Sequence, residues 1–182
     1  MTLKEQITNA FREVKYPGDD KIAIKEWYLK AEALDGYVGK KREDLTIDFI
    51  NNGHRECTSF MTKEAFYYYL PTFMILCAES AYEMDIFSDR IIGKLTLPRE
   101  EDHQRVLKFL NEEEGVKSED AYIFPSNEDE LKSAQYEFIC FVKGLSKEQR
   151  QAIISFLQFF KDKYKDSMAD AALDRFWGKL GR

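Results

Sequence analysis

The sequence predicts an all-α protein, a single-domain multi-helix bundle with at most one small β-hairpin. Apolar residues recur three and four positions apart along most of the chain, which places them on one face of a helix. Four prolines and nine glycines divide this pattern into segments of helical length. The 182 residues, 44% of them hydrophobic, are enough for one core. We therefore expect one helical domain over 1–165, with a C-terminal helix at 166–182 packed on it.

The expected helices of the first quarter of the chain begin and end at recognisable residues. Thr2 and Glu5 have the spacing of a capping box, and the helix that they begin is expected to end at Pro17. Two further helices are expected, one over 20–34 and a shorter one over 44–52 that ends at the following glycine.

The helix expected to begin at Thr62 contains a proline. Pro71 has no N–H to donate to the carbonyl of Tyr67, so we expect this helix to bend or split between these two residues. Ser146 and Gln149 repeat the capping-box spacing near the end of the chain. The later elements are expected to be a short helix at 81–89, brief strands at 91–97 and 122–124, and helices at 126–143, 146–164 and 166–182.

Composition argues against two classes of partner. The 27 Lys and Arg residues against 33 Asp and Glu residues give a formal net charge of −6, whereas nucleic-acid binders usually present a basic surface. The longest apolar stretch, 67–78, is too short for a membrane span. The first five residues have no feature of a signal peptide, so we expect a cytoplasmic protein that binds neither nucleic acid nor membrane.

Residues that commonly carry catalysis are few. Cys57, Cys77 and Cys140 contain no C-x-x-C pair, so we expect free buried thiols. His54 and Cys57 form an isolated H-x-x-C without the second pair of a zinc site, and His103 falls on an apolar helical face. No phosphate-binding or dinucleotide motif occurs, so no metal and no cofactor is expected.

Negative charge is concentrated between Glu100 and Glu130. This segment has eleven acidic and three basic residues, so its net charge is −8 and that of the rest of the chain is +2. His103, Val106, Leu107 and Leu110 have helical spacing, and the acids at 112–114 fall at the end of the helix that this spacing predicts, where the helix dipole disfavours anions. A ridge of this kind attracts a basic protein, and a solvated loop is the alternative interpretation. The acids of the ridge are Glu100, Glu101, Asp102, Glu112, Glu113, Glu114, Glu119, Asp120, Glu128, Asp129 and Glu130.

The tyrosine run at 67–69 is a second candidate surface. Successive helical residues are turned by about 100°, so the three rings cannot all face a core. We expect Tyr69 to pack inside and assign Tyr67 and Tyr68 to protein binding, with a boundary position as the alternative. Exposed rings there would serve a homo-oligomer as readily as another protein.

Two motifs carry a resemblance. Residues 60–71, FMTKEAFYYYLP, contain the pattern F-x-T-x-x-A-F-x-Y-Y-L-P, and residues 145–150, LSKEQR, precede Phe156-Leu157. Both resemble motifs of an uncharacterised bacterial family, over residues 1–165. The resemblance implies a bacterial cytosolic protein and supplies no catalytic residue. In size and acidity the chain is also similar to toxin-immunity proteins.

The sequence therefore predicts a non-enzymatic protein-binding module. Its acidic surface and scarcity of catalytic groups favour an immunity or antitoxin-type inhibitor that binds a basic toxin. The alternative is a small cytosolic enzyme that uses His103 or His54 together with acidic residues.

Overall fold

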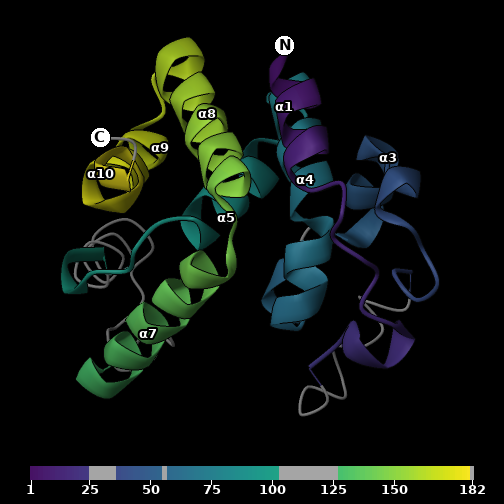
Figure 1. Cartoon of the computed structure of the whole chain (residues 1–182), viewed down its shortest axis with the longest axis horizontal. Helices are drawn as coiled ribbons and strands as arrows, with labels where there is room; N and C mark the ends of the chain where they lie inside the picture. Colours follow the sequence, from purple (N-terminus) through teal and green to yellow (C-terminus); the bar gives the residue numbers. More distant parts are fainter. Residues whose placement is uncertain (25–35, 55–56, 103–126, 181–182) are drawn as a thin grey trace, which may run out of the picture. The chain divides into compact units, whose positions relative to one another are not determined.

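The computed structural model describes residues 1–24, 36–54, 57–102 and 127–180, which fold as helices joined by turns. Among these residues the pairing of extended chain is limited to one antiparallel bridge between Ala23 and Met61, so the all-α class is confirmed. The α-helices are α1 (Leu3–Ala10), α3 (Ile47–Phe49), α4 (Lys63–Glu79), α5 (Asp85–Lys94), α7 (Glu128–Gly144), α8 (Lys147–Tyr164), α9 (Ser167–Ala172) and α10 (Gly178–Leu180) (Figure 1). Shorter helical turns are η1 (Asp19–Lys21), η3 (Arg42–Asp44), η4 (Ile50–His54), η5 (Cys57–Ser59) and η6 (Leu173–Trp177).

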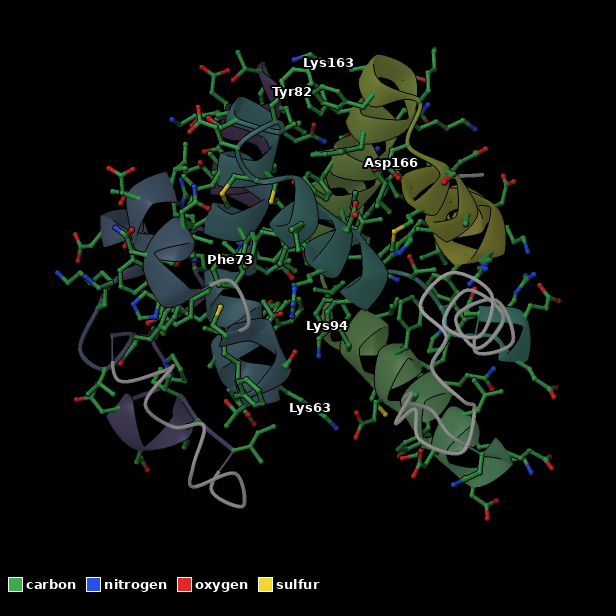
Figure 2. All side chains as sticks on the ribbon, turned by 180° about the vertical axis from the view of Figure 1, so that it is seen from behind. Lys63, Phe73, Tyr82, Lys94, Lys163 and Asp166 are labelled. Carbon is green, nitrogen blue, oxygen red and sulfur yellow. The ribbon has the colours of Figure 1, made fainter. Side chains whose placement is uncertain are left out.

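The chain divides into two compact units. The main unit consists of Met1–Thr96 together with Ser146–Arg182, and the inserted unit consists of Leu97–Leu145. In the main unit, α8 packs against α1 and α9, α4 packs against α1 and α5, and α5 packs against α9. Phe73 of α4, labelled in Figure 2, contributes to this core, and its ring centroid lies 5.1 Å from that of Phe87 in α5.

The capping signals are confirmed. The Thr2 hydroxyl accepts from the N–H of Glu5, whose carboxylate accepts from the N–H of Thr2. The same reciprocal pair joins Ser146 to Gln149 at the start of α8. Thr62 caps α4 as expected, with its side-chain oxygen accepting from the third residue of the helix. The capping residues could be predicted because each capping side chain accepts from a backbone N–H group that has no partner within the helix.

The first helix ends earlier than expected. It finishes at Ala10 and the chain turns over 11–13, well before Pro17. The carbonyls released at this point are bound by a distant residue, because the Arg42 guanidinium donates to the carbonyl oxygens of Phe11 and Arg12. A partner 30 residues away therefore replaces the hydrogen bonds of another helical turn.

Helix α4 continues through Pro71 as one α-helix, so of the two expected outcomes, a bend or a split near Pro71, the split is wrong. Burial along much of its length explains how the helix tolerates the lost hydrogen bond, since packing outweighs a local preference. Its buried residues are Ala65, Tyr68, Tyr69, Leu70, Pro71, Phe73, Met74 and Cys77.

The strand expected at 91–97 is also wrong. Residues 91–94 are the last turn of α5, where Ile91, Ile92 and the following Leu95 are fully buried. Adjacent β-branched residues favour a strand locally, but packing decides the conformation here. The companion strand at 122–124 and most of the helix expected at 20–34 lie outside the described residues.

Candidate protein-binding surface

The negative charge of the chain belongs to the inserted unit. Its sequence contains twelve acidic and six basic residues, a net charge of −6, whereas the sequence of the main unit contains 21 of each. Among the assigned acids, Glu100, Glu101, Glu128 and Asp129 are exposed. Asp102 and Glu130 are half-buried. The remaining assigned acids, Glu112, Glu113, Glu114, Glu119 and Asp120, lie outside the described residues.

Three of these acids form the first turn of α7. The Asn127 side chain caps the helix by accepting from the N–H of Glu130 at 2.9 Å. Carboxylates in a first turn interact favourably with the helix dipole, so Glu128, Asp129 and Glu130 help to begin the helix. Glu128 also pairs with Lys132 one turn later, with Oε1 and Nζ 2.7 Å apart.

An exposed aromatic residue accompanies the acids on α7. Tyr136 is 71% exposed, and it shares one side of the helix with exposed Asp129, Ser133 and Cys140, at spacings of four, three and four residues. The sequence analysis did not assign Tyr136 to the site. Its position off the apolar stripe that contains buried Phe138 is the signal that identifies it, because tyrosine is enriched where proteins bind one another.

The tyrosine run serves the interior of the main unit. Tyr68 is only 5% exposed, and its hydroxyl oxygen accepts from the backbone N–H of Arg42 at 3.3 Å. The half-buried Tyr67 donates to Gln149 Oε1 at 2.9 Å, and buried Tyr69 donates to two carbonyl oxygens of the 37–40 loop. Tyr67 and Tyr68 thus join segments of this chain and offer little surface to a partner.

His54 packs in an aromatic cluster. Its ring stacks on Phe49, with centroids 4.1 Å apart, and meets the ring of Tyr37 at a steep angle. A Cβ added to Gly36 would lie 2.7 Å from His54 Cε1, so glycine at that position allows the close approach. The Cys57 Sγ accepts from the Tyr37 hydroxyl at 3.0 Å. This packing accounts for His54 and Cys57 without a catalytic role, while His103 lies outside the described residues.

No group of three metal-ligating side chains occurs among the residues that the structure describes. Nor is any helix in the described ranges both long enough and apolar enough to cross a membrane.

The three cysteines differ in their surroundings. The expectation of a buried thiol is confirmed for Cys57 and Cys77 and is wrong for Cys140, which is exposed on α7. Burial raises the pKa of each buried thiol from its ordinary 9.0 to about 12. Above pH 9 the unfolded chain therefore loses thiol protons that the folded chain keeps, so stability falls as the pH rises.

Alkaline conditions are thus expected to destabilise the protein through these two thiols. Between pH 9 and pH 10, each is expected to lower the free energy of unfolding by about 1 kcal/mol. Urea unfolding at a series of pH values measures the slope. Cys57→Ala should make the slope shallower, while the matched change at exposed Cys140 should leave it unaltered. If the free energy of unfolding fell equally steeply with pH in both variants, the buried Cys57 thiol would not be the cause of the pH dependence.

A smaller aromatic cluster lies where α8 ends. Tyr82 is 88% exposed, and its ring centroid is 5.9 Å from that of Tyr164. The Lys163 ammonium lies 5.0 Å from the centroid of the Tyr164 ring. This cluster carries a cation, which distinguishes it from the acidic surface of α7.

Comparison of the chain with protein-family models, with curated proteins and with solved structures finds no match. The resemblance of 60–71 to a bacterial family therefore remains an expectation, and a functional argument for this chain depends on its own residues.

Proposed function

We propose that this chain is a non-catalytic, cytoplasmic protein-binding module that captures a basic protein through its inserted unit. The observation that carries the proposal is the coincidence of charge and an exposed ring. The inserted unit accounts for the whole net charge of −6, and exposed Tyr136 lies on the same helix as the exposed acids Glu128 and Asp129.

Each part has a physical task. Carboxylates at the surface accelerate encounter with a basic protein and set the orientation of binding. The tyrosine ring supplies apolar contact area with little loss of side-chain freedom, which is typical of residues that dominate binding energy. A bacterial immunity protein or antitoxin needs this combination, since it must bind its basic toxin quickly and hold it.

The test is to capture binding partners from a cell lysate with the tagged full chain, at low and at high salt. The captured proteins are then identified by mass spectrometry. We expect a basic protein that is retained at low salt and lost at high salt, because surface charges are screened. Co-expression with this chain should then relieve the growth inhibition that the captured protein causes.

Charge-reversal variants locate the surface. Glu128→Lys with Asp129→Lys, and separately Tyr136→Ala, should each weaken capture at least tenfold, about 1.4 kcal/mol. The control is Glu13→Lys with Glu64→Lys, which makes the same change of net charge in the main unit. Like the first variant, it removes one carboxylate that is in an ion pair, that of Glu13, and one in the first turn of a helix, that of Glu64. If both double variants lost capture of the partner to the same extent, net charge alone would govern binding, and the proposal would be contradicted.

A further inference from the structure

Two aromatic rings form a corner near the C-terminal end of α8. The ring centroids of Phe159 and Tyr164 lie 5.9 Å apart, and the ring planes meet at 76°. Both side chains are half-buried, so part of each ring remains accessible to solvent. Tyr164 also packs against the buried ring of Phe160, with centroids 5.4 Å apart, which anchors the corner to the core of the main unit.

A third ring reaches this corner from another part of the main unit. Tyr82 lies in the turn between α4 and α5, and its ring stands at 86° to that of Tyr164, with centroids 5.9 Å apart. Ala81 and Met84 are buried and hold the turn in place, while Tyr82 itself is 88% exposed. We refer to Phe159, Tyr164 and Tyr82 together as the aromatic corner.

The aromatic corner already holds a cation. The Lys163 ammonium lies over the ring of Phe159, 4.9 Å from its centroid, and over the ring of Tyr164, 5.0 Å from its centroid. Aromatic faces attract cations through the negative potential of their π-electrons. The corner also lies at the C-terminal end of α8, where the helix dipole adds negative potential. Both effects favour a positive charge at this place.

We propose that the aromatic corner binds a small zwitterion with a quaternary ammonium group, which takes the place of the Lys163 ammonium. A primary ammonium is strongly hydrated and has three N–H donors, which ring faces satisfy poorly. A quaternary ammonium has no N–H to satisfy, so it gives up less when it moves from water to the ring faces. Lys163 is exposed, and its flexible side chain turns into solvent when the ligand arrives.

The charges around the aromatic corner favour a zwitterion over a bare cation. Lys163 and Lys165 flank Tyr164 in the sequence, and both are exposed. Asp162 and Asp166, the acids nearest to them in the sequence, already accept hydrogen bonds from other groups of the chain. The two ammonium groups repel a bare cation, whereas they attract the carboxylate or phosphate that a zwitterion carries.

Titration of the full chain with glycine betaine, followed by NMR, tests the proposal. Ring currents shift the N-methyl protons of a ligand that lies over aromatic faces, so the shift reports the site directly. We expect weak but saturable binding. Two ligands are matched controls, because glycine has the same charges on a primary ammonium and tert-butylacetate has the same shape without the cation. Neither should bind at the concentrations at which betaine saturates the site.

Three variants locate the site. Tyr82→Ala removes an exposed ring and should weaken betaine binding about fivefold without changing the circular dichroism of the chain. The matched change of an exposed tyrosine in the inserted unit, Tyr136→Ala, should leave betaine binding unaltered. Lys163→Ala removes the competing ammonium and should tighten the binding of tetramethylammonium, a bare cation.

Several results would overturn the proposal. They are the absence of a saturable shift, equal binding of betaine and tert-butylacetate, and equal betaine binding by the Tyr82→Ala and Tyr136→Ala variants. Phosphatidylcholine vesicles carry the same zwitterion on a lipid, so sedimentation with these vesicles in the absence of a betaine shift would also contradict a small ligand. Tyr136→Ala should impair capture of the basic partner and Tyr82→Ala should not, so each of the two proposals can fail alone.

Discussion

Replacement of Trp177 by alanine is expected to lower the free energy of unfolding by about 3–5 kcal/mol. Trp177 is fully buried, and its indole N–H donates to the carbonyl oxygen of Leu95, the C-cap residue that follows α5. That carbonyl lies beyond the last intrahelical hydrogen bond, so the substitution leaves a cavity and a buried acceptor without its partner. Chemical denaturation with a two-state fit measures the loss.

Two further substitutions separate packing from hydrogen bonding. Trp177→Phe keeps most of the buried ring and loses only the donor, so it is expected to cost about 1–3 kcal/mol. Phe176→Ala removes the neighbouring ring, which is half-exposed, and should cost distinctly less than Trp177→Ala. If the two alanine variants unfolded at the same denaturant concentration, the role given to Trp177 would be wrong.

Replacement of Arg42 by alanine is expected to cost about 2–4 kcal/mol, although arginine is usually a surface residue. Its side chain is 12% exposed, its guanidinium donates to the carbonyl oxygens of Phe11 and Arg12, and it lies 5.3 Å from the ring centroid of Tyr68. The substitution therefore leaves the end of α1 without the donors that replace its next turn. Arg42→Lys should recover less than half of the loss, because an ammonium lacks the planar array of donors.

Arg12 provides an unusually close control. Each of the two arginines pairs through Nε with the glutamate that follows it, at 3.0 Å for Arg12 and 2.9 Å for Arg42. Arg12 is 74% exposed, so Arg12→Ala should change stability by no more than about 0.5 kcal/mol. Similar losses for both alanine variants would mean that the ion pair, rather than the buried carbonyl contacts, stabilises the fold.

Features encoded within a few residues could be predicted from the sequence. The capping residues Thr2, Thr62 and Ser146 were placed correctly because the groups that they satisfy lie three residues away. The excess of acidic residues between Glu100 and Glu130 could also be predicted, since the formal charge of a segment follows from its residues and does not depend on folding. The strand predicted at 91–97 was wrong for the opposite reason. This segment is a helix end because the fold buries Ile91, Ile92 and Leu95, and because Trp177, 82 residues away, donates a hydrogen bond to the Leu95 carbonyl.

The candidate surface was only partly predictable for the same physical reason. Tyr68 and Tyr67 are withdrawn from the surface by Arg42 and Gln149, which lie 26 and 82 residues away in the sequence. A helical pattern specifies which residues share a face, but it does not specify what covers that face. The exposed ring of Tyr136 was missed, although its place opposite the apolar stripe of α7 was visible in the sequence.

The discontinuity of the main unit governs the order in which the protein can fold during synthesis. Residues 1–96 emerge from the ribosome first, but the partners of Tyr67 and of the Leu95 carbonyl, Gln149 and Trp177, emerge only after the whole inserted unit. Part of the apolar surface of residues 1–96 therefore stays exposed to solvent until α8 has been synthesised. The inserted unit, by contrast, can form its internal contacts as soon as it has emerged. Chaperone binding to nascent chains should persist until α8 and the segment after it have left the exit tunnel.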